Sequence, residues 1–225
     1  MADMVLQRKN MVESQIRPSD ITDRRIIRAM LEVPREAFVP ASQTTIAYGD
    51  LDVRLDGADV SKKFLPRALM APRVFAKLVQ LCAIESHDDV LIIGGGTGYS
   101  AAIVARLAKT VTVLEENPAL AASAKKNLAG QSVSAADIHI GPLAGGLPAK
   151  APFDVILVEG AAAQIPQALL DQLAVNGRLA VILAAGAAGK ATLWRRHAAS
   201  FDATEAFDAG GFPLPGFAKV PEFSF

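Results

Sequence analysis

The stretch Val90-Leu-Ile-Ile-Gly94-Gly-Gly96-Thr-Gly98-Tyr99 decides the fold prediction for this chain. Its continuous apolar run is expected for a parallel strand that is covered on both faces. Three glycines at alternate positions follow, and glycine lets the backbone turn sharply and lets a ligand approach where a Cβ atom would clash. A helical run, YSAAIVARLA, then starts at Tyr99. This strand, turn and helix predict the first unit of a doubly wound α/β sheet, in which nucleotides bind at the point where the strand order reverses.

The chain after residue 88 repeats this alternation of strand and helix. Strands are expected over residues 110–115, 137–141, 153–160 and 177–185, and helices over residues 118–130 and 166–174. Repeated units of this kind imply a mostly parallel sheet with right-handed crossovers. The segment ATLWRRH and the following tail, which is rich in Phe, Gly and Pro, are expected to add an antiparallel pair at the sheet edge.

The residues before this region predict a smaller unit of helices and loops. Helices are expected over residues 5–16, over 24–33 after an N-cap at Ser19-Asp20 or Thr22-Asp23, and over 72–83 with Pro72 in the first turn. Residues 40–66 are expected to form loops with short extended pieces. The sequence therefore predicts an N-terminal helical subdomain over residues 1–85 and a Rossmann-like core over residues 86–225.

Composition restricts the classes of partner. Lys+Arg and Asp+Glu both total 23 in 225 residues, so the net charge does not favour nucleic acid or an anionic membrane. No apolar stretch is long enough to cross a bilayer, and the N-terminus lacks the apolar core of a signal peptide, so a cytoplasmic protein is expected. Cys82 has no partner for a disulfide and is expected in the core. His87, His139 and His197 lie in separate segments, so no metal site is expected.

Glu115 ends the second expected strand, where a carboxylate can accept hydrogen bonds from both hydroxyls of a ribose. The pattern G-x-G-x-G followed by an aromatic residue is the form that binds S-adenosylmethionine. However, Gly96, Gly98 and Ala101 also satisfy the looser dinucleotide pattern G-x-G-x-x-G/A. A tight turn with no ligand is the third possibility. The turn alone does not decide among them.

Segments along nearly the whole chain resemble the protein-L-isoaspartate (D-aspartate) O-methyltransferase family. The matching segments, in order, are residues 11–17, 29–30, 33–35, 38–40, 47–50, 90–99, 113–115 with 118, 152–158, 165–173 and 177–179. The resemblance implies a seven-stranded, doubly wound methyltransferase sheet with S-adenosylmethionine as the cofactor. It also implies methyl transfer to the carboxylate of isoaspartyl residues in proteins or peptides, which leads to protein repair. By the same resemblance the cofactor would be held by Gly94, Gly95, Gly96, Thr97, Gly98, Tyr99, Glu115, Gly141, Pro142 and Leu143.

Three positions depart from the family pattern near the expected site. Met70 stands where the family has the serine that faces the reacting centre, and a thioether cannot donate a hydrogen bond. Ile92 stands where the family has an acidic residue, and Pro142 replaces the aspartate of a Gly-Asp-Gly turn and lacks an N–H group. The sequence therefore predicts either a methyltransferase of reduced or altered activity, or an inactive member that binds a ligand or a protein. It leaves open the acceptor substrate, the oligomeric state, and the roles of Glu159 and of the loop over residues 55–72.

Overall fold

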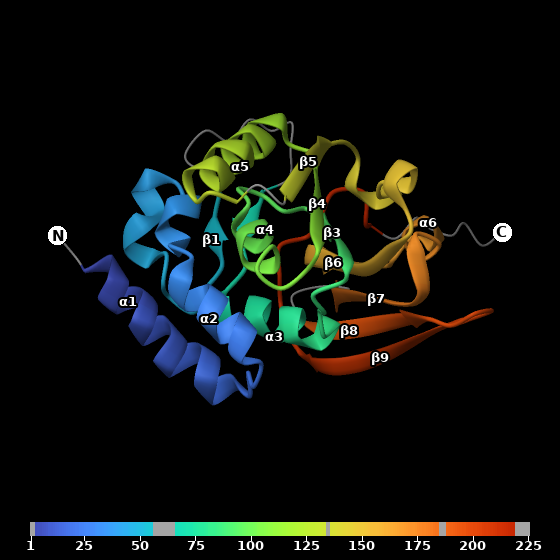
Figure 1. The fold of residues 1–225 in the computed structure, drawn as a ribbon, viewed down its shortest axis with the longest axis horizontal. Helices are drawn as coiled ribbons and strands as arrows, with labels where there is room; N and C mark the ends of the chain where they lie inside the picture. The colour runs from blue at the N-terminus through green and yellow to red at the C-terminus, as the bar shows by residue number, and fades with distance from the viewer. Residues whose placement is uncertain (1–2, 56–65, 134–135, 185–187, 219–225) are drawn as a thin grey trace.

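The computed structural model describes residues 3–55, 66–133, 136–184 and 188–218, and its centre is a seven-stranded sheet (Figure 1). The strand order is β5-β4-β3-β6-β7-β8-β9, and the first five strands in that order are parallel. The strands are β3 (Asp89–Ile93), β4 (Thr110–Glu115), β5 (Ala136–Ile140), β6 (Phe153–Ala162), β7 (Leu173–Ala184), β8 (Gly189–Arg196) and β9 (Phe201–Asp208). The chain runs outward from β3 through β4 to β5 and then returns to the other side of β3 as β6. This reversal confirms the predicted doubly wound fold.

Side chains of the central strands alternate between two hydrophobic cores. On β3, Val90 and Ile92 belong to the core on one face of the sheet, while Leu91 and Ile93 belong to the core on the other. Strand β6 alternates in the same way. Because successive side chains of a strand point to opposite faces, each apolar run contributes to both cores, as the continuous hydrophobicity predicted.

Capping residues explain where two of the helices start. The helices are α1 (Met4–Met11), α2 (Arg24–Glu32), α3 (Pro72–Cys82), α4 (Tyr99–Val104), α5 (Pro118–Gly130) and α6 (Gln167–Leu170), and α1 continues as a π-helical segment, Val12–Ile16. The Asp23 side chain accepts a hydrogen bond from the N–H of Arg25, which settles the two predicted N-caps of α2 in favour of Thr22-Asp23. Asn117 caps α5 in the same way, and Pro118 occupies its first turn.

Three predicted boundaries are wrong: the ends of two helices and the start of the strand expected over residues 177–185. The helix expected over 166–174 ends at Leu170, because Leu173 already pairs with Phe153 as part of β7. Asn176 has a positive φ and lies in the register shift that lets β7 start so early. The helix expected to follow the glycine turn for ten residues ends at Val104 and continues as turns.

The predicted antiparallel pair exists at the sheet edge and consists of β8 and β9. Strand β8 pairs with both β7 and β9, so the segment ATLWRRH is interior and β9 forms the edge. The described part of the tail returns to the centre of the sheet, where Pro213 bridges Ala161. Residues 219–225 lie outside the described residues.

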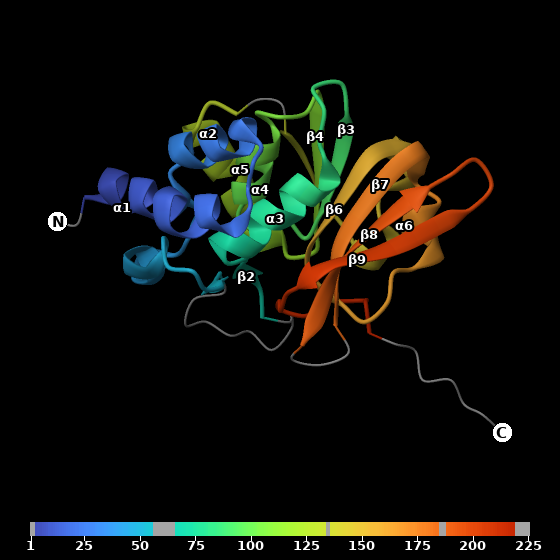
Figure 2. The same ribbon diagram turned by 90° about the horizontal axis from the view of Figure 1, so that it is seen from below.

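The N-terminal helices pack against the sheet core. In both views α1 and α2 gather at one end of the molecule and the β8–β9 hairpin lies at the other (Figures 1 and 2). Met11, Ile16 and Met30 belong to the same buried cluster as Val90 and Ile92 of β3. The division into a subdomain over residues 1–85 and a core over residues 86–225 stays a prediction.

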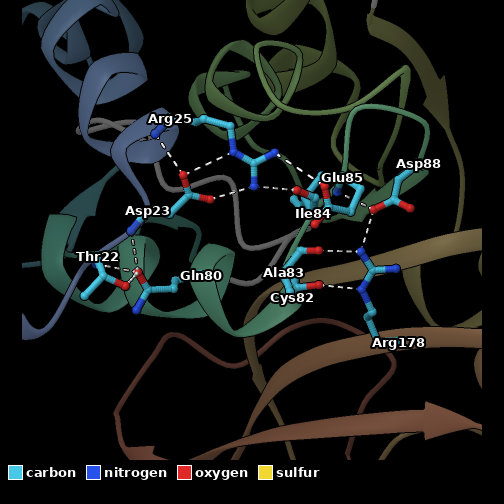
Figure 3. A network of polar contacts seen from close by, with 10 residues as sticks. All are labelled: Thr22, Asp23, Arg25, Gln80, Cys82, Ala83, Ile84, Glu85, Asp88 and Arg178. Atoms are coloured by element: carbon cyan, nitrogen blue, oxygen red, sulfur yellow. Dashed lines mark hydrogen bonds and ion pairs between the residues drawn. The ribbon is translucent and has the colours of Figure 1, made fainter.

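A polar network joins α2, the end of α3 and β7 (Figure 3). Arg178 on β7 donates to the carbonyl oxygens of Cys82 and Ala83 and forms an ion pair with Asp88. The carboxylate of Asp88 also accepts the N–H of Glu85. Arg178 therefore holds the carboxyl end of α3 and the loop that leads into β3.

Removing Arg178 is expected to destabilise this junction. Asp88 is only 1% exposed, so Arg178→Ala leaves a buried carboxylate without its cation. We expect the free energy of unfolding to fall by about 3–5 kcal/mol in urea titrations. Arg195→Ala is the matched control, because Arg195 lies opposite on β8 and is exposed. Equal losses for the two variants would contradict this role of Arg178.

Candidate cofactor-binding site

The glycine turn lies at the carboxyl end of β3, as predicted. Gly94, Gly96 and Gly98 have φ values of 77°, 53° and 94°. Residues other than glycine adopt this left-handed backbone conformation rarely. At Gly98, a Cβ atom would also lie 3.2 Å from the Cβ of Ala124 on α5. The backbone conformation therefore favours glycine at position 96. At position 98, both the backbone conformation and the packing against α5 favour glycine.

Glu115 is held against this turn by main-chain N–H groups. Its Oε2 accepts a hydrogen bond from Gly96 N at 2.9 Å, and its Oε1 accepts one from Asn117 N at 3.0 Å. The residue is fully buried. The structure therefore brings together the glycine turn and the carboxylate that the sequence singled out.

Arg67 also contacts these two groups, and the sequence analysis did not identify it. Its Nη1 lies 3.0 Å from Oε1 of Glu115, and its Nη2 donates to the carbonyl oxygen of Gly94 at 2.6 Å. The Arg67 side chain is 4% exposed. Only the open question about the loop over residues 55–72 pointed to this region, and residues 56–65 of that loop lie outside the described residues.

Leu55 lies over the centre of the turn. A Cβ atom on Gly96 would lie 2.7 Å from Cδ1 of Leu55. Leu55 and Arg67 are joined, because Leu55 N donates to the carbonyl oxygen of Arg67 at 2.9 Å. They extend a two-stranded antiparallel ribbon formed by β1 (Val53–Arg54) and β2 (Ala68–Leu69). The ribbon thus places both side chains on the glycine turn.

The tail covers the neighbouring strand end. A Cβ atom on Gly160, near the end of β6, would lie 2.7 Å from Cγ of Leu214, and one on Gly94 would lie 3.2 Å from Cδ2 of the same leucine. Leu214 N also donates to the carbonyl oxygen of Ala161. Leu214 therefore packs where the ends of β3 and β6 meet.

A buried arginine, Arg35, lies against the ring of Tyr99, the residue that directly follows the turn. Arg35 donates to the carbonyl oxygens of Ala47 and Met70 at 2.7 and 2.6 Å. Its guanidinium lies 5.0 Å from the ring centroid of Tyr99, which also packs edge-on against Phe38. The predicted cofactor residue Tyr99 is fully buried, and the Met70 side chain packs in the main core. Arg35 thus fixes the backbone at Met70, the position where the resemblance leads one to expect the family serine.

The other predicted residues occupy distinct places. The Thr97 hydroxyl donates to the carbonyl oxygen of Phe38, so it links the turn to the N-terminal part of the chain. Gly141 follows β5 and donates its N–H to the carbonyl oxygen of Glu115 at 3.2 Å. Pro142 is exposed, whereas Leu143 is buried in the second core.

Gly95 and Ile92 are packed inside the scaffold. A Cβ atom on Gly95 would lie 2.6 Å from Cγ1 of Val113, so only glycine fits between the turn and β4. Ile92 is fully buried in the first hydrophobic core. An aspartate at position 92 would therefore bury a charge in apolar surroundings unless neighbouring groups rearranged.

Glu159 lies in the carboxyl-terminal half of β6 and is also buried. Its Oε2 accepts a hydrogen bond from the Ser100 hydroxyl at 2.6 Å. Burial raises the pKa of Glu159 to about 7, although the Ser100 hydrogen bond and the charges of Arg67 and Arg35 oppose this rise. The sequence had marked Glu159 as a residue of unknown role beside the cleft. The structure makes it a carboxyl group that titrates near neutral pH.

Two general features of the described residues bear on function. They contain no group of three or more His, Cys, Asp or Glu side chains placed to hold a metal ion. No helix in the described part of the chain is long and apolar enough to cross a membrane.

The parallel sheet, the glycine turn and the acidic residue at the end of the next strand define a Rossmann-like protein of the methyltransferase type. The family model for protein-L-isoaspartate(D-aspartate) O-methyltransferase matches residues 6–206. The chain therefore belongs to this family.

Individual relatives agree with the family match. The chain is 39% identical to the protein-L-isoaspartate O-methyltransferase of Methanoculleus marisnigri over 77% of this chain and 75% of that protein. It is 35% identical to the enzyme of the same name from Methylorubrum extorquens over 92% of this chain and 86% of that protein.

Solved structures show the same fold. A protein-L-isoaspartate O-methyltransferase structure superimposes with a TM-score of 0.81 at 23% identity, over 93% of this chain and 66% of that one. A PCMT structure from Plasmodium falciparum in complex with S-adenosyl-L-homocysteine gives 0.76 at 19% identity, over 92% of this chain and 97% of that one.

The raised pKa of Glu159 predicts a pH dependence of stability. Its pKa is about 7 in the folded protein against an ordinary value of 4.5, so its contribution is fully present below pH 4.5 and is lost as the pH rises to about 7. Glu159→Gln removes this loss. Between about pH 4.5 and pH 8, the free energy of unfolding of the variant should rise relative to wild type by on the order of 2–3 kcal/mol.

Urea unfolding of both proteins across this pH range tests the prediction. Glu205→Gln on β9 is the control, since Glu205 is exposed. A difference between Glu159→Gln and wild type that stays constant with pH would show that folding does not raise the pKa of Glu159.

Proposed function

We propose that this chain is an S-adenosylmethionine-dependent methyltransferase that acts on isoaspartyl carboxylates in proteins or peptides. The observation that carries the proposal is the placement of Glu115 against the glycine turn, within a chain that belongs to this family. Such a reaction returns damaged aspartyl sites toward normal aspartate and is therefore a repair activity. The cytoplasmic location and the absence of a nucleic-acid partner stay predictions of the sequence.

The residues at the ends of β3 and β4 fit the cofactor. Gly94, Gly96 and Gly98 carry no side chains of their own that would keep a ligand from the backbone of the turn, and Glu115 is the carboxylate that ribose hydroxyls would use. The loop over residues 141–143 follows β5 beside them. In the conformation described, Arg67 and Leu55 contact the same groups, so the binding residues are present but covered.

The chemistry demands little of the protein beyond positioning. S-adenosylmethionine, when bound, supplies a methyl group on a sulfonium that is a good leaving group. A carboxylate acceptor is already ionised at neutral pH, so the chain needs no strong base and contributes mainly alignment. Arg35 supports this alignment by fixing the backbone carbonyl of Met70. Met70 itself offers no hydrogen bond from its side chain, which predicts slower transfer or a changed acceptor.

A second candidate is a family member that binds the ligand without transferring a methyl group. The burial of Met70 in the core favours this candidate, because the side chain at the position of the family serine packs inward.

A transfer assay separates the two candidates. The purified protein is incubated with S-adenosylmethionine carrying a labelled methyl group and with an isoaspartyl peptide; the same peptide with normal aspartate is the control. We expect label in the isoaspartyl peptide only. A folded preparation that labels neither peptide, yet binds S-adenosyl-L-homocysteine in calorimetry, would reject the transferase and support the binding module.

Glu115→Ala tests the assigned cofactor residue. Loss of hydrogen bonds to a charged acceptor removes roughly 1.5–3 kcal/mol, so affinity for S-adenosyl-L-homocysteine should fall about 10- to 150-fold. Glu116→Ala is the matched control, because it removes the same charge one residue further along, where the side chain is partly exposed. Equal affinities for the two variants would show that Glu115 does not contact the ligand.

A further inference from the structure

We propose that Arg67 competes with the cofactor for Glu115, so that the binding site is closed by the protein's own chain and opens only when this ion pair breaks. The inference rests on the proposed function, because it concerns the same site. It assigns to Arg67 control over how tightly the cofactor binds.

Arg67 donates to two acceptors at the turn, the Glu115 carboxylate and the carbonyl oxygen of Gly94. One guanidinium nitrogen contacts Oε1 of Glu115 at 3.0 Å, and the other donates to the Gly94 carbonyl at 2.6 Å. The planar guanidinium holds several donors in a fixed fork, so it reaches both acceptors at once. The two hydroxyls of the cofactor's ribose would use the same carboxylate. The ribose and the Arg67 guanidinium cannot both occupy it.

Glu115 has no exposed oxygen in this state. Oε1 accepts from both Arg67 and Asn117 N, and Oε2 accepts from Gly96 N. The residue is 0% exposed. A ligand therefore reaches the carboxylate only after Arg67 leaves, whereas the two main-chain contacts can stay.

Two leucines complete the closure. Leu55 occupies the space above Gly96, and Leu214 lies against Gly94. Leu55 and Arg67 are hydrogen-bonded to each other at the end of the ribbon of β1 and β2. The other side of the ribbon is fixed, because Ala71 N donates to Oδ1 of Asp52 at 2.7 Å. Leu55 and Arg67 therefore form one unit that covers the turn.

Opening of the site replaces the contacts of Arg67 with Glu115 and Gly94 by contacts with water and with the cofactor. When Arg67 moves to solvent, water satisfies its guanidinium, and the ribose hydroxyls can replace it on Glu115. The observed affinity is then the intrinsic affinity multiplied by the fraction of molecules in the open state. A substitution that removes the guanidinium raises this fraction and tightens binding, even though it deletes a side chain from the site.

Calorimetric titration with S-adenosyl-L-homocysteine tests the inference on wild type, Arg67→Ala and Arg67→Lys. We expect Arg67→Ala to bind tenfold or more tightly than wild type. Arg67→Lys should lie between them, since lysine keeps the charge but not the fork of donors. Arg73→Ala is the control; Arg73 pairs with Asp50, is half-exposed, and should leave the affinity unchanged. Circular dichroism of each variant verifies folding, and Arg67→Lys keeps the test valid if the alanine variant does not fold.

The outcomes separate this inference from the proposed function. If wild type binds as tightly as the Arg67 variants, the competition is wrong and the transferase proposal is untouched. If an Arg67 variant binds tenfold or more tightly than wild type but no protein labels an isoaspartyl peptide, the competition is supported and the transfer reaction is rejected. If neither wild type nor any variant binds, both proposals are overturned.

Discussion

The buried carboxylate of Glu115 is the constraint on which the arrangement around the site depends. A carboxylate removed from water needs hydrogen-bond donors on its oxygens, and the fold supplies them from three separate parts of the chain. Gly96 provides one from the glycine turn, Asn117 provides one from the start of α5, and Arg67 provides the charged partner. The ends of β3 and β4 and the ribbon of β1 and β2 are therefore held together through one side chain.

The architecture was accessible from the sequence because its signals are local and repeated. The apolar run before Gly94 predicts a strand with two covered faces, and Val90 and Leu91 do lie in different cores. Pro118 correctly indicated the start of α5, and Thr22-Asp23 was one of the two N-caps that the sequence offered for α2. Boundaries failed where tertiary pairing overrode local preference, as at Leu173, whose partner on β6 lies far away in the sequence.

The contents of the site were only partly accessible. Glycines and an acidic residue after a strand follow a known spacing, so Gly96 and Glu115 could be named in advance. Arg67 lies in a segment without periodicity, and nothing in its neighbours indicates that it folds back onto Glu115. The unusual pKa of Glu159 likewise depends on burial beside Ser100, and only three-dimensional packing supplies that. Family membership therefore predicts the scaffold better than it predicts which side chains surround the glycine turn.

The return of the tail to the middle of the sheet also governs how the molecule is built. Pro213 bridges Ala161, and Leu214 and Phe217 complete the second core beside strands that are synthesised much earlier. Contacts between such distant parts of a chain slow folding, because a long loop must close before they form. During synthesis on the ribosome, this core stays incomplete until the residues up to Phe217 have emerged. The segment that carries Leu214 and Phe217 thus acts as the last structural piece of a core whose strand β3 was made long before.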